Sequence, residues 1–573
     1  GFYDMSADDQ HCTSEIKLLP ALLKENGYFT VALGKWDIGD IVKKCTPTYS
    51  GFDAFLGYYE ACLSDYWYHW APHQCDKKGF GPDALPYVDF VNSSGVDNIT
   101  PSSRALNGTY NAHIFTAEAI RHIDNTAAQP VATRTPLFLY LAYQNCHLAC
   151  GSAPDNVAVL SGKKHGLNAP CGTVDLYSHL DNDQYKLQGA VVTELDYGVG
   201  NVTAALKRTG LWENTVLFLV SDNGAQLDHG YNWPLRGGKH TFWEGGVRVS
   251  SFLTSPLLPA SIQGTKFNGM AHSSDWYVTL VEGLAGGNVS NSGERPSDGH
   301  NLWPAMLSGS ASPRREVVHQ VNNSFYNAMT GQSFDKDGNE VSKGDGDGSL
   351  GMAIRVDNWK LILGNPGQDT WKKFPTPMTT ITKFGKTGGI HEAGTDHCRS
   401  PSGHTTGGPG PGTYLFDLSK DLNESHNLAK DPAHAALIAT LTQRMVEAGK
   451  TGPPPAYVFM SKDAQKRGED NECAATMKTG FVSPGDLFPP TPTPPGPSPP
   501  VPGPARDQCT KADGVLNSNG KFANVACCAA TCVTCGGEFC NKRPGGKTSC
   551  CSKEVANSGR VCTTDKAPCK VVL

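Results

Sequence analysis

The chain has 573 residues, of which 39% are hydrophobic and 18% charged, and its formal net charge is −6. This length exceeds what one hydrophobic core serves, so we expect two or three domains. The lack of a basic excess argues against a nucleic acid partner. Because no apolar run reaches the roughly 18 residues of a membrane helix, we expect no membrane span.

The first elements in chain order are a helix and a strand. Apolar residues recur at helical spacing from Ile16 to Gly27, and a short strand is expected at Val31 to Leu33. Unbroken apolar runs at 137–142 and 216–220 predict two parallel strands, neighbours in one sheet and covered on both faces. We therefore expect both strands to be central.

A long helix is predicted between these two strands, because apolar residues from Leu187 to Leu206 recur every three or four positions. The polar group 221–224 directly follows the second strand. Open α/β sheets bind their ligands at the carboxyl ends of strands, so we expect chemistry at this position.

Beyond residue 330 the pattern changes to Gly-rich loops, a hairpin at 352–363 and a closing helix around Leu437 to Met445, which predicts an α+β subdomain. Residues 452–505 are rich in proline and predict a semi-rigid linker. The predicted domains are 1–330 (α/β, incomplete at its start), 331–451 (α+β), 452–505 (linker) and 506–573 (a small disulfide-rich module).

Cysteine usage and glycosylation sequons indicate an oxidising compartment. Of the 19 cysteines, ten lie between Cys509 and Cys569, in a module too poor in large apolar residues to fold without staples. Zinc is the competing interpretation, because Cys532 and Cys535 form a C-x-x-C. Seven sequons, at Asn92, Asn98, Asn107, Asn201, Asn288, Asn322 and Asn423, point the same way. We expect a secreted or cell-surface glycoprotein.

Several segments in order resemble one family. They are Gly34-Lys-Trp-Asp-Ile-Gly39, the strand Pro136 to His147, Ser221-Asp-Asn-Gly224, Asn232-Trp-Pro-Leu-Arg-Gly-Gly-Lys239 and Trp243-Glu-Gly-Gly-Val-Arg248. Together they resemble the sulfatases, in particular the arylsulfatase B branch, over residues 15 to 449. The resemblance implies an alkaline-phosphatase-like mixed sheet between helices.

The resemblance also implies a site. Asp222 and Asn223 match ligands of a calcium ion, and their oxygens suit a hard cation, although in isolation Asp-Asn-Gly is also an ordinary turn after a strand. Lys35, His147 and Lys239 match residues that bind sulfate and transfer protons. Two ammonium groups neutralise sulfate oxygens, and a histidine with a pKa near neutrality protonates the departing alcohol.

Two departures from the family pattern weaken an enzymatic interpretation. The family's nucleophile lies in C-x-P-S-R or S-x-P-S-R after a pair of aspartates, and neither motif occurs in the 573 residues. Asp8-Asp9 lacks a preceding strand, and Cys12-Thr-Ser-Glu15 lacks Pro and Arg. Asp37 stands where the family has a catalytic histidine. The chain begins at Gly1 without an initiator Met or a signal pattern, and we expect a processed or incomplete start.

Two disulfides follow from the same resemblance: Cys12 with Cys45, which bracket the first helix and strand as a structural pair does in that branch, and Cys62 with Cys75. Each closes a modest loop and stabilises the fold by roughly 3 kcal/mol.

Three functions are compatible with these patterns. The first is a sulfuric ester hydrolase acting on a sulfated small molecule or glycan. The second is a non-catalytic structural or binding component of an extracellular matrix, wall or filament, which self-assembles or joins other surface glycoproteins. A phosphatase or phosphodiesterase of the same superfamily is weaker, because the motifs at 34–39 and 232–239 are sulfatase-like.

Overall fold

The computed structural model describes the following residues: 17–39, 43–60, 63, 66–67, 69, 88–96, 98–101, 106, 108–149, 167, 169–180, 183–226, 230–291, 297–321, 333–334, 340–341, 351–367, 412–451, 539–542 and 548–551. Its helices are α1 (Leu19–Glu25), α2 (Asn111–Ala127), α3 (Cys171–Asp175), α4 (Asp183–Arg208), α5 (Glu244–Val247), α6 (Ser273–Val278), α7 (Trp303–Ser308) and α8 (Ala435–Thr451), with a π-helical turn at Thr279–Leu284.

The strands are β1 (Phe29–Lys35), β2 (Ala54–Tyr58), β3 (Val91–Ser94), β4 (Ile99–Pro101), β5 (Leu137–Ala142), β6 (Leu217–Val220), β7 (Ser251–Thr254), β8 (Glu316–Gln320), β9 (Ser333–Phe334), β10 (Glu340–Val341), β11 (Met352–Val356), β12 (Trp359–Gly364), β13 (Gly412–Asp417), β14 (Phe539–Lys542) and β15 (Thr548–Cys551).

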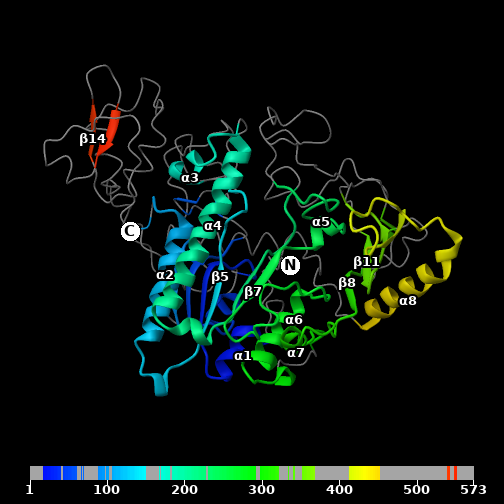
Figure 1. Ribbon diagram of the computed structural model, residues 1–573, viewed down its shortest axis with the longest axis horizontal. Coiled ribbons are helices and arrows are strands. Elements are labelled where there is room, and N and C mark those ends of the chain that lie inside the picture. Colours follow the sequence, from blue (N-terminus) through cyan, green and yellow to red (C-terminus); the bar gives the residue numbers. More distant parts are fainter. Residues whose placement is uncertain are drawn as a thin grey trace.

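The largest sheet is mixed, with the order β4-β3-β2-β1-β5. β1 pairs in parallel with β2 and with β5, whereas β3 and β4 run antiparallel. Leucines of β5 pack on a core built with α2 and α4, and on the other face Phe138 packs against α1 and the π-helical turn. The predicted mixed sheet between helices is confirmed (Figure 1).

The predicted arrangement of the two long apolar strands is wrong. β6 pairs antiparallel with β7, and within the described residues these two form a separate sheet rather than joining β5. β5 lies at the edge of the large sheet, and none of its six residues is fully buried. The apolar sequence of β5 is therefore only partly covered.

A second sheet, β13-β12-β11-β8, is antiparallel and packs against α8, at the end of the molecule away from α2 and α4 (Figure 1). The predicted hairpin is β11–β12 and the predicted closing helix is α8. β8 pairs with β11 although it precedes the boundary expected at residue 330, so this sheet begins at Glu316. Of the linker and the cysteine-rich module, only the hairpin β14–β15 lies within the described residues.

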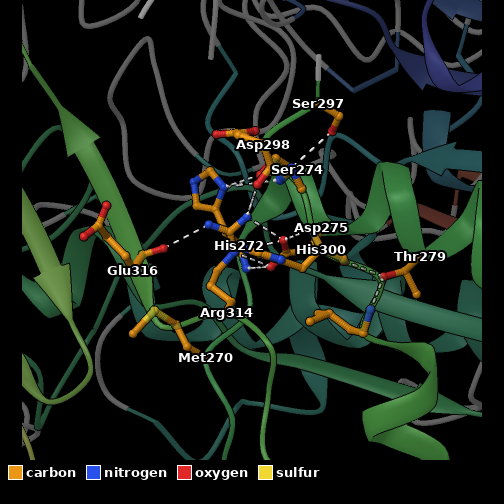
Figure 2. A network of polar contacts seen from close by, with 12 residues as sticks. Met270, His272, Ser274, Asp275, Thr279, Ser297, Asp298, His300, Arg314 and Glu316 are labelled. Carbon is orange, nitrogen blue, oxygen red and sulfur yellow. Dashed lines mark hydrogen bonds and ion pairs between the residues drawn. The ribbon is translucent and has the colours of Figure 1, made fainter. Parts of the chain in front are cut away.

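A buried ion pair ties the second sheet to the first domain. Arg314, just before β8, donates hydrogen bonds from Nε and Nη2 to Asp275 in α6, at 2.6–2.9 Å. Figure 2 shows that the same carboxylate also accepts from the backbone of His272 and His300. Asp275 is fully buried, so every one of these bonds replaces lost hydration.

In the part of the chain that the structure describes, no helix is both long and apolar enough to cross a membrane.

Candidate active site

Three strand ends and one loop bring together the side chains singled out in the sequence. Lys35 is the last residue of β1, His147 follows β5 and Asp222 follows β6. The Nζ of Lys239, from the loop after β6, lies 3.2 Å from His147 Nε2. The charges of Lys35 and Asp222 both act on the pKa of His147, so the four groups share one site.

Two glycines allow this close convergence. A Cβ on Gly34 would lie 2.0 Å from the carbonyl oxygen of Ala142, and one on Gly57 would lie 1.9 Å from that of Gly34. Gly34 also has a φ of +102°, which side chains other than glycine rarely adopt. The ends of β1, β2 and β5 therefore approach one another only because these positions lack side chains.

The residues after Lys35 are held by Trp36. Its indole Nε1 donates to the carbonyl oxygens of Cys45 at 2.9 Å and Gly39 at 3.0 Å, and this fixes the turn. Asp37 Oδ2 then lies 3.0 Å from Lys35 Nζ. Burial raises the pKa of Asp37, and the neighbouring lysine opposes that rise. The ion pair neutralises one of the two ammonium groups expected to face a sulfate.

Buried amides that the sequence did not single out hold the loop bearing His147. Gln144 Oε1 accepts from Asn111 of α2 at 2.6 Å, and Asn145 Nδ2 donates to the Val191 carbonyl of α4 at 2.9 Å. The hydroxyl of Tyr66 donates to the backbone carbonyl of His147. The position of His147 thus depends on both helices that cover the sheet.

The protonation state of His147 differs from the expectation. Burial and the charge of Lys239 lower the pKa of His147 to about 4, so the ring is neutral near pH 7. Its Nδ1 lies 2.8 Å from the Leu148 carbonyl, which only accepts, so the proton resides on Nδ1. Nε2 is then the acceptor for the Lys239 ammonium. The expected near-neutral pKa is wrong because burial and the flanking lysines disfavour the charged ring.

The side chain of Asn232 holds the loop 232–239, which ends at Lys239, in its conformation. Its Oδ1 accepts from the Ala225 backbone N–H at 2.8 Å, and its Nδ2 donates to the carbonyls of Ala225 and Gly237 at 2.8 and 3.0 Å. The backbone N–H of Lys239 donates to Ala225 as well. One side chain therefore joins the loop after β6 to the loop that carries the lysine.

The same loop is anchored to the second sheet by a buried cluster of charges. Lys360 Nζ of β12 lies 3.0 Å from Glu244 Oε1 and 2.8 Å from Glu424 Oε1, and all three side chains are at most 2% exposed. Arg236 Nη1 donates to the Glu424 carbonyl at 2.9 Å, and its guanidinium stacks on the Trp243 ring. Sequence patterns gave no sign of this cluster, because Glu244, Lys360 and Glu424 come from three segments that are at least 64 positions apart.

Asp222 and Asn223 offer one carboxylate and one amide oxygen, which suit a hard cation such as calcium. Asp222 is exposed, and Asn223 uses its Nδ2 on the Gly224 carbonyl at 3.1 Å. Within the described residues no group of three His, Cys, Asp or Glu side chains is placed to hold a metal. The described donors fit calcium in chemistry and supply only part of the six to eight oxygens that it prefers.

Asp8, Asp9 and Cys12, considered for the missing nucleophile segment, lie outside the described residues. Among the described residues, Cys146 directly precedes His147 and is a free cysteine. Burial and the charge of Asp222 raise its pKa to about 11, so at neutral pH it is a protonated thiol and a poor nucleophile.

Cys45 is disulfide-bonded. Its expected partner Cys12, and the pair Cys62 and Cys75, lie outside the described residues. Four sequon asparagines, Asn92, Asn98, Asn201 and Asn288, are exposed, and Asn423 is half-buried. Asn107 and Asn322 also lie outside the described part, and glycosylation stays a prediction.

Comparison with known proteins shows which family the chain resembles. A family model described as Sulfatase matches residues 1–286, about half of the chain. Arylsulfatase J of Mus musculus is 31% identical over 440 residues, covering 77% of this chain and 63% of that protein. N-acetylgalactosamine-6-sulfatase of the same species is 27% identical over 311 residues, covering 53% and 51%. The chain thus spans between half and two thirds of these relatives.

The fold is also found in solved structures. The crystal structure of Ps i-CgsB superposes with a TM-score of 0.51 at 21% identity, covering 80% of this chain and 81% of that one. Its complex with k-i-k-neocarrahexaose gives the same TM-score. Since the family model, the curated relatives and the fold agree, this chain belongs to the sulfatase family.

Proposed function

We propose that this protein is a secreted, arylsulfatase-like glycoprotein whose site binds a sulfate monoester. The observation that carries the proposal is the contact between Lys239 Nζ and His147 Nε2 at 3.2 Å, beside Lys35 at the end of the neighbouring strand. Cations and a proton acceptor on rigid strand ends suit an anion that must be oriented before its ester bond breaks.

The pair of Lys239 and neutral His147 holds one transferable proton. In the free site it lies on the lysine ammonium, and the imidazole accepts its hydrogen bond. A bound sulfate ester adds negative charge, which raises the pKa of the ring and favours the proton on Nε2. From there it passes to the ester oxygen as the bond between sulfur and that oxygen breaks. Hydrolysis further requires a nucleophile, which the family carries in a motif that the 573 residues lack.

Asp222 and Asn223 are the residues that would hold calcium, which when bound neutralises charge on sulfate oxygens. For the substrate, the names of the relatives suggest either an aryl sulfate or a sulfated sugar such as N-acetylgalactosamine 6-sulfate. Secretion is supported by the disulfide-bonded Cys45 and by the exposed sequon asparagines.

A second candidate is a sulfatase-like binding protein without turnover in an extracellular assembly. The observation in its favour is the Lys35–Asp37 ion pair, because a carboxylate beside the anion site repels the substrate. In this candidate the fold and part of the anion site persist while catalysis does not.

Calorimetry with inorganic sulfate, and turnover of a chromogenic sulfate ester with and without calcium, test the proposal. We expect the 573-residue chain to bind sulfate without turnover. Lys239→Ala should abolish binding, and Asp37→Asn should strengthen it on the order of tenfold by removing one nearby negative charge.

Lys420→Ala is the matched control, because that side chain is 81% exposed and pairs with Asp417. Sulfate binding that is indifferent to Lys239 and Asp37 alike would overturn the proposal. Turnover by this chain, lost in His147→Ala, would refute the expectation of inactivity and the second candidate together.

A further inference from the structure

A buried phenol at the end of β2 has an unused hydroxyl. Tyr58 is the last residue of this strand, and its side chain is completely buried. Among the residues that the structure describes, its hydroxyl finds no hydrogen-bond partner. Such a group destabilises the fold, because it gives up hydration without a replacement. An unpartnered buried hydroxyl therefore indicates a role outside folding, such as contact with a ligand.

The strand register places this phenol beside Lys35. β1 and β2 are parallel, and Tyr58 is the direct partner of Lys35 in the ladder. Residues paired in this way point to the same face of a sheet from strands about 4.8 Å apart. Leu33 and Leu56, two positions earlier on each strand, pack with Tyr58 on the core that α2 and α4 cover. Tyr58 and Lys35 thus share one face at the carboxyl end of the sheet.

Carboxylates on either side of the site act on the Tyr58 hydroxyl. Burial raises the pKa of Tyr58 well above its usual value, and three charges raise it further, those of Asp89, Asp37 and Asp222. The phenol therefore keeps its proton at neutral pH and is available as a donor. Because Asp37 follows β1 and Asp222 follows β6, the hydroxyl adjoins the same strand ends as the other groups of the site.

The carboxylates near the phenol already have donors. Both oxygens of Asp89 accept from backbone N–H groups, those of Tyr59 and Glu60, at 2.9 and 2.8 Å. Asp37 Oδ2 is paired with Lys35 Nζ at 3.0 Å. An acceptor that enters with a ligand would satisfy the phenol, and the oxygens of a sulfate only accept hydrogen bonds.

We propose that Tyr58 is a further binding residue of the anion site, whose hydroxyl donates a hydrogen bond to a sulfate oxygen beside Lys35. The inference rests on the proposed function, because it requires that an anion enters this site. A neutral donor suits this position, since Asp37 already compensates much of the charge of Lys35. The hydroxyl would thus support anion binding at the end of the site where the ammonium is weakest.

Tyr58→Phe removes one oxygen atom and keeps the ring, and it should have two effects of opposite sign. In the free chain the urea midpoint should rise, because an unpartnered buried hydroxyl is gone. In calorimetry with inorganic sulfate the affinity should fall about tenfold, as expected for a hydrogen bond to a charged group. A residue with a purely structural role would lower the urea midpoint instead.

Tyr59→Phe is the matched control. Tyr59 is the next residue and is equally buried, but its ring stacks on Phe55 in the core on the opposite face of the sheet. This variant should bind sulfate like the wild type. A near-ultraviolet difference spectrum gives a second measurement, because a phenol that gains an acceptor changes its absorption. Saturating sulfate should produce the tyrosine difference band in the wild type and in Tyr59→Phe, but not in Tyr58→Phe.

The Lys239→Ala variant separates this inference from the proposed function. If Lys239→Ala leaves sulfate binding unchanged, the anion site itself is refuted. If Lys239→Ala abolishes binding while Tyr58→Phe binds like the wild type, only the role of Tyr58 is wrong. A lower urea midpoint in Tyr58→Phe, or equal losses of affinity in Tyr58→Phe and Tyr59→Phe, would also overturn the inference.

Discussion

Replacing Lys360 by methionine tests how strongly the buried charge cluster joins the two sheets. Its ammonium lies within 3.0 Å of Glu244 and Glu424, and it is fully buried. Burial alone would lower the pKa of Lys360, but the two carboxylates outweigh it and raise the pKa. Lys360→Met keeps the volume of the side chain and removes the charge that compensates both glutamates.

In the Lys360→Met variant, Glu244 and Glu424 differ in the positive groups and donors that remain to compensate their charges. Glu244 still has Arg248 and Arg355, at 3.6 and 3.8 Å, and together with Lys360 they outweigh burial and lower its pKa to about 2. Glu424 has a raised pKa from burial and keeps mainly the backbone N–H of Glu244, at 2.6 Å. Breaking such a buried pair costs about 3–5 kcal/mol, and Lys360→Met/Glu424→Gln should recover a large part.

Urea unfolding, followed by tryptophan fluorescence at several pH values, measures this loss. Trp243 reports on it, because its ring stacks with Arg236, which binds the Glu424 carbonyl. A carboxylate whose pKa is raised in the folded state loses stability as pH rises, so the deficit of Lys360→Met should be larger at pH 8 than at pH 5. The control Lys420→Met removes a lysine whose side chain is 81% exposed and should cost at most about 1 kcal/mol. Equal losses in both variants would refute a compensating role for Lys360.

Three further changes have defined outcomes. Asp275→Asn should lower the free energy of unfolding by about 3–5 kcal/mol. The hydrogen bonds from Arg314 outweigh burial and lower the pKa of the Asp275 carboxyl. Acid unfolding should therefore show that the wild-type advantage fades as pH drops below about 4. Asn232→Ala should weaken sulfate binding through the loosened Lys239 loop and cost about 1–3 kcal/mol, measured by calorimetry and thermal unfolding. Sulfate affinity should rise as pH falls through about 4, where His147 gains its charge, and His147→Gln should abolish that rise in titrations across this range.

Helices and strands with an unbroken apolar pattern could be predicted from the local sequence alone. The strand predicted at 137–142 has these bounds in the structure, because its apolar run is unbroken and follows a proline. The helix α4 was predictable because its apolar residues keep a period of three or four over six turns. The order of strands in a sheet has no such local signal, and the expected pairing of β5 with β6 was wrong for that reason.

The site was predictable to the extent that it lies at strand ends. Lys35 ends β1, Asp222 lies two residues beyond β6 and His147 lies in the loop after β5, so each is at the carboxyl end of a strand. The pKa of His147 was not predictable, because it depends on burial and on Lys239, which is 92 positions away. The buried amides that hold the histidine loop were missed for the same reason, since their partners lie on α2 and α4.

The two lysines of the site are not equally available to an anion. Lys35 is already paired with Asp37 at 3.0 Å, whereas Lys239 faces the uncharged Nε2 of His147. The charge of Lys239 is therefore less compensated than that of Lys35 and attracts an incoming anion more strongly, although burial lowers the pKa of Lys239. In a site with histidine in place of Asp37, both lysines would face neutral rings and contribute alike. In the proposed function, the aspartate thus shifts anion binding toward the loop that Asn232 and the Lys360 cluster hold in place.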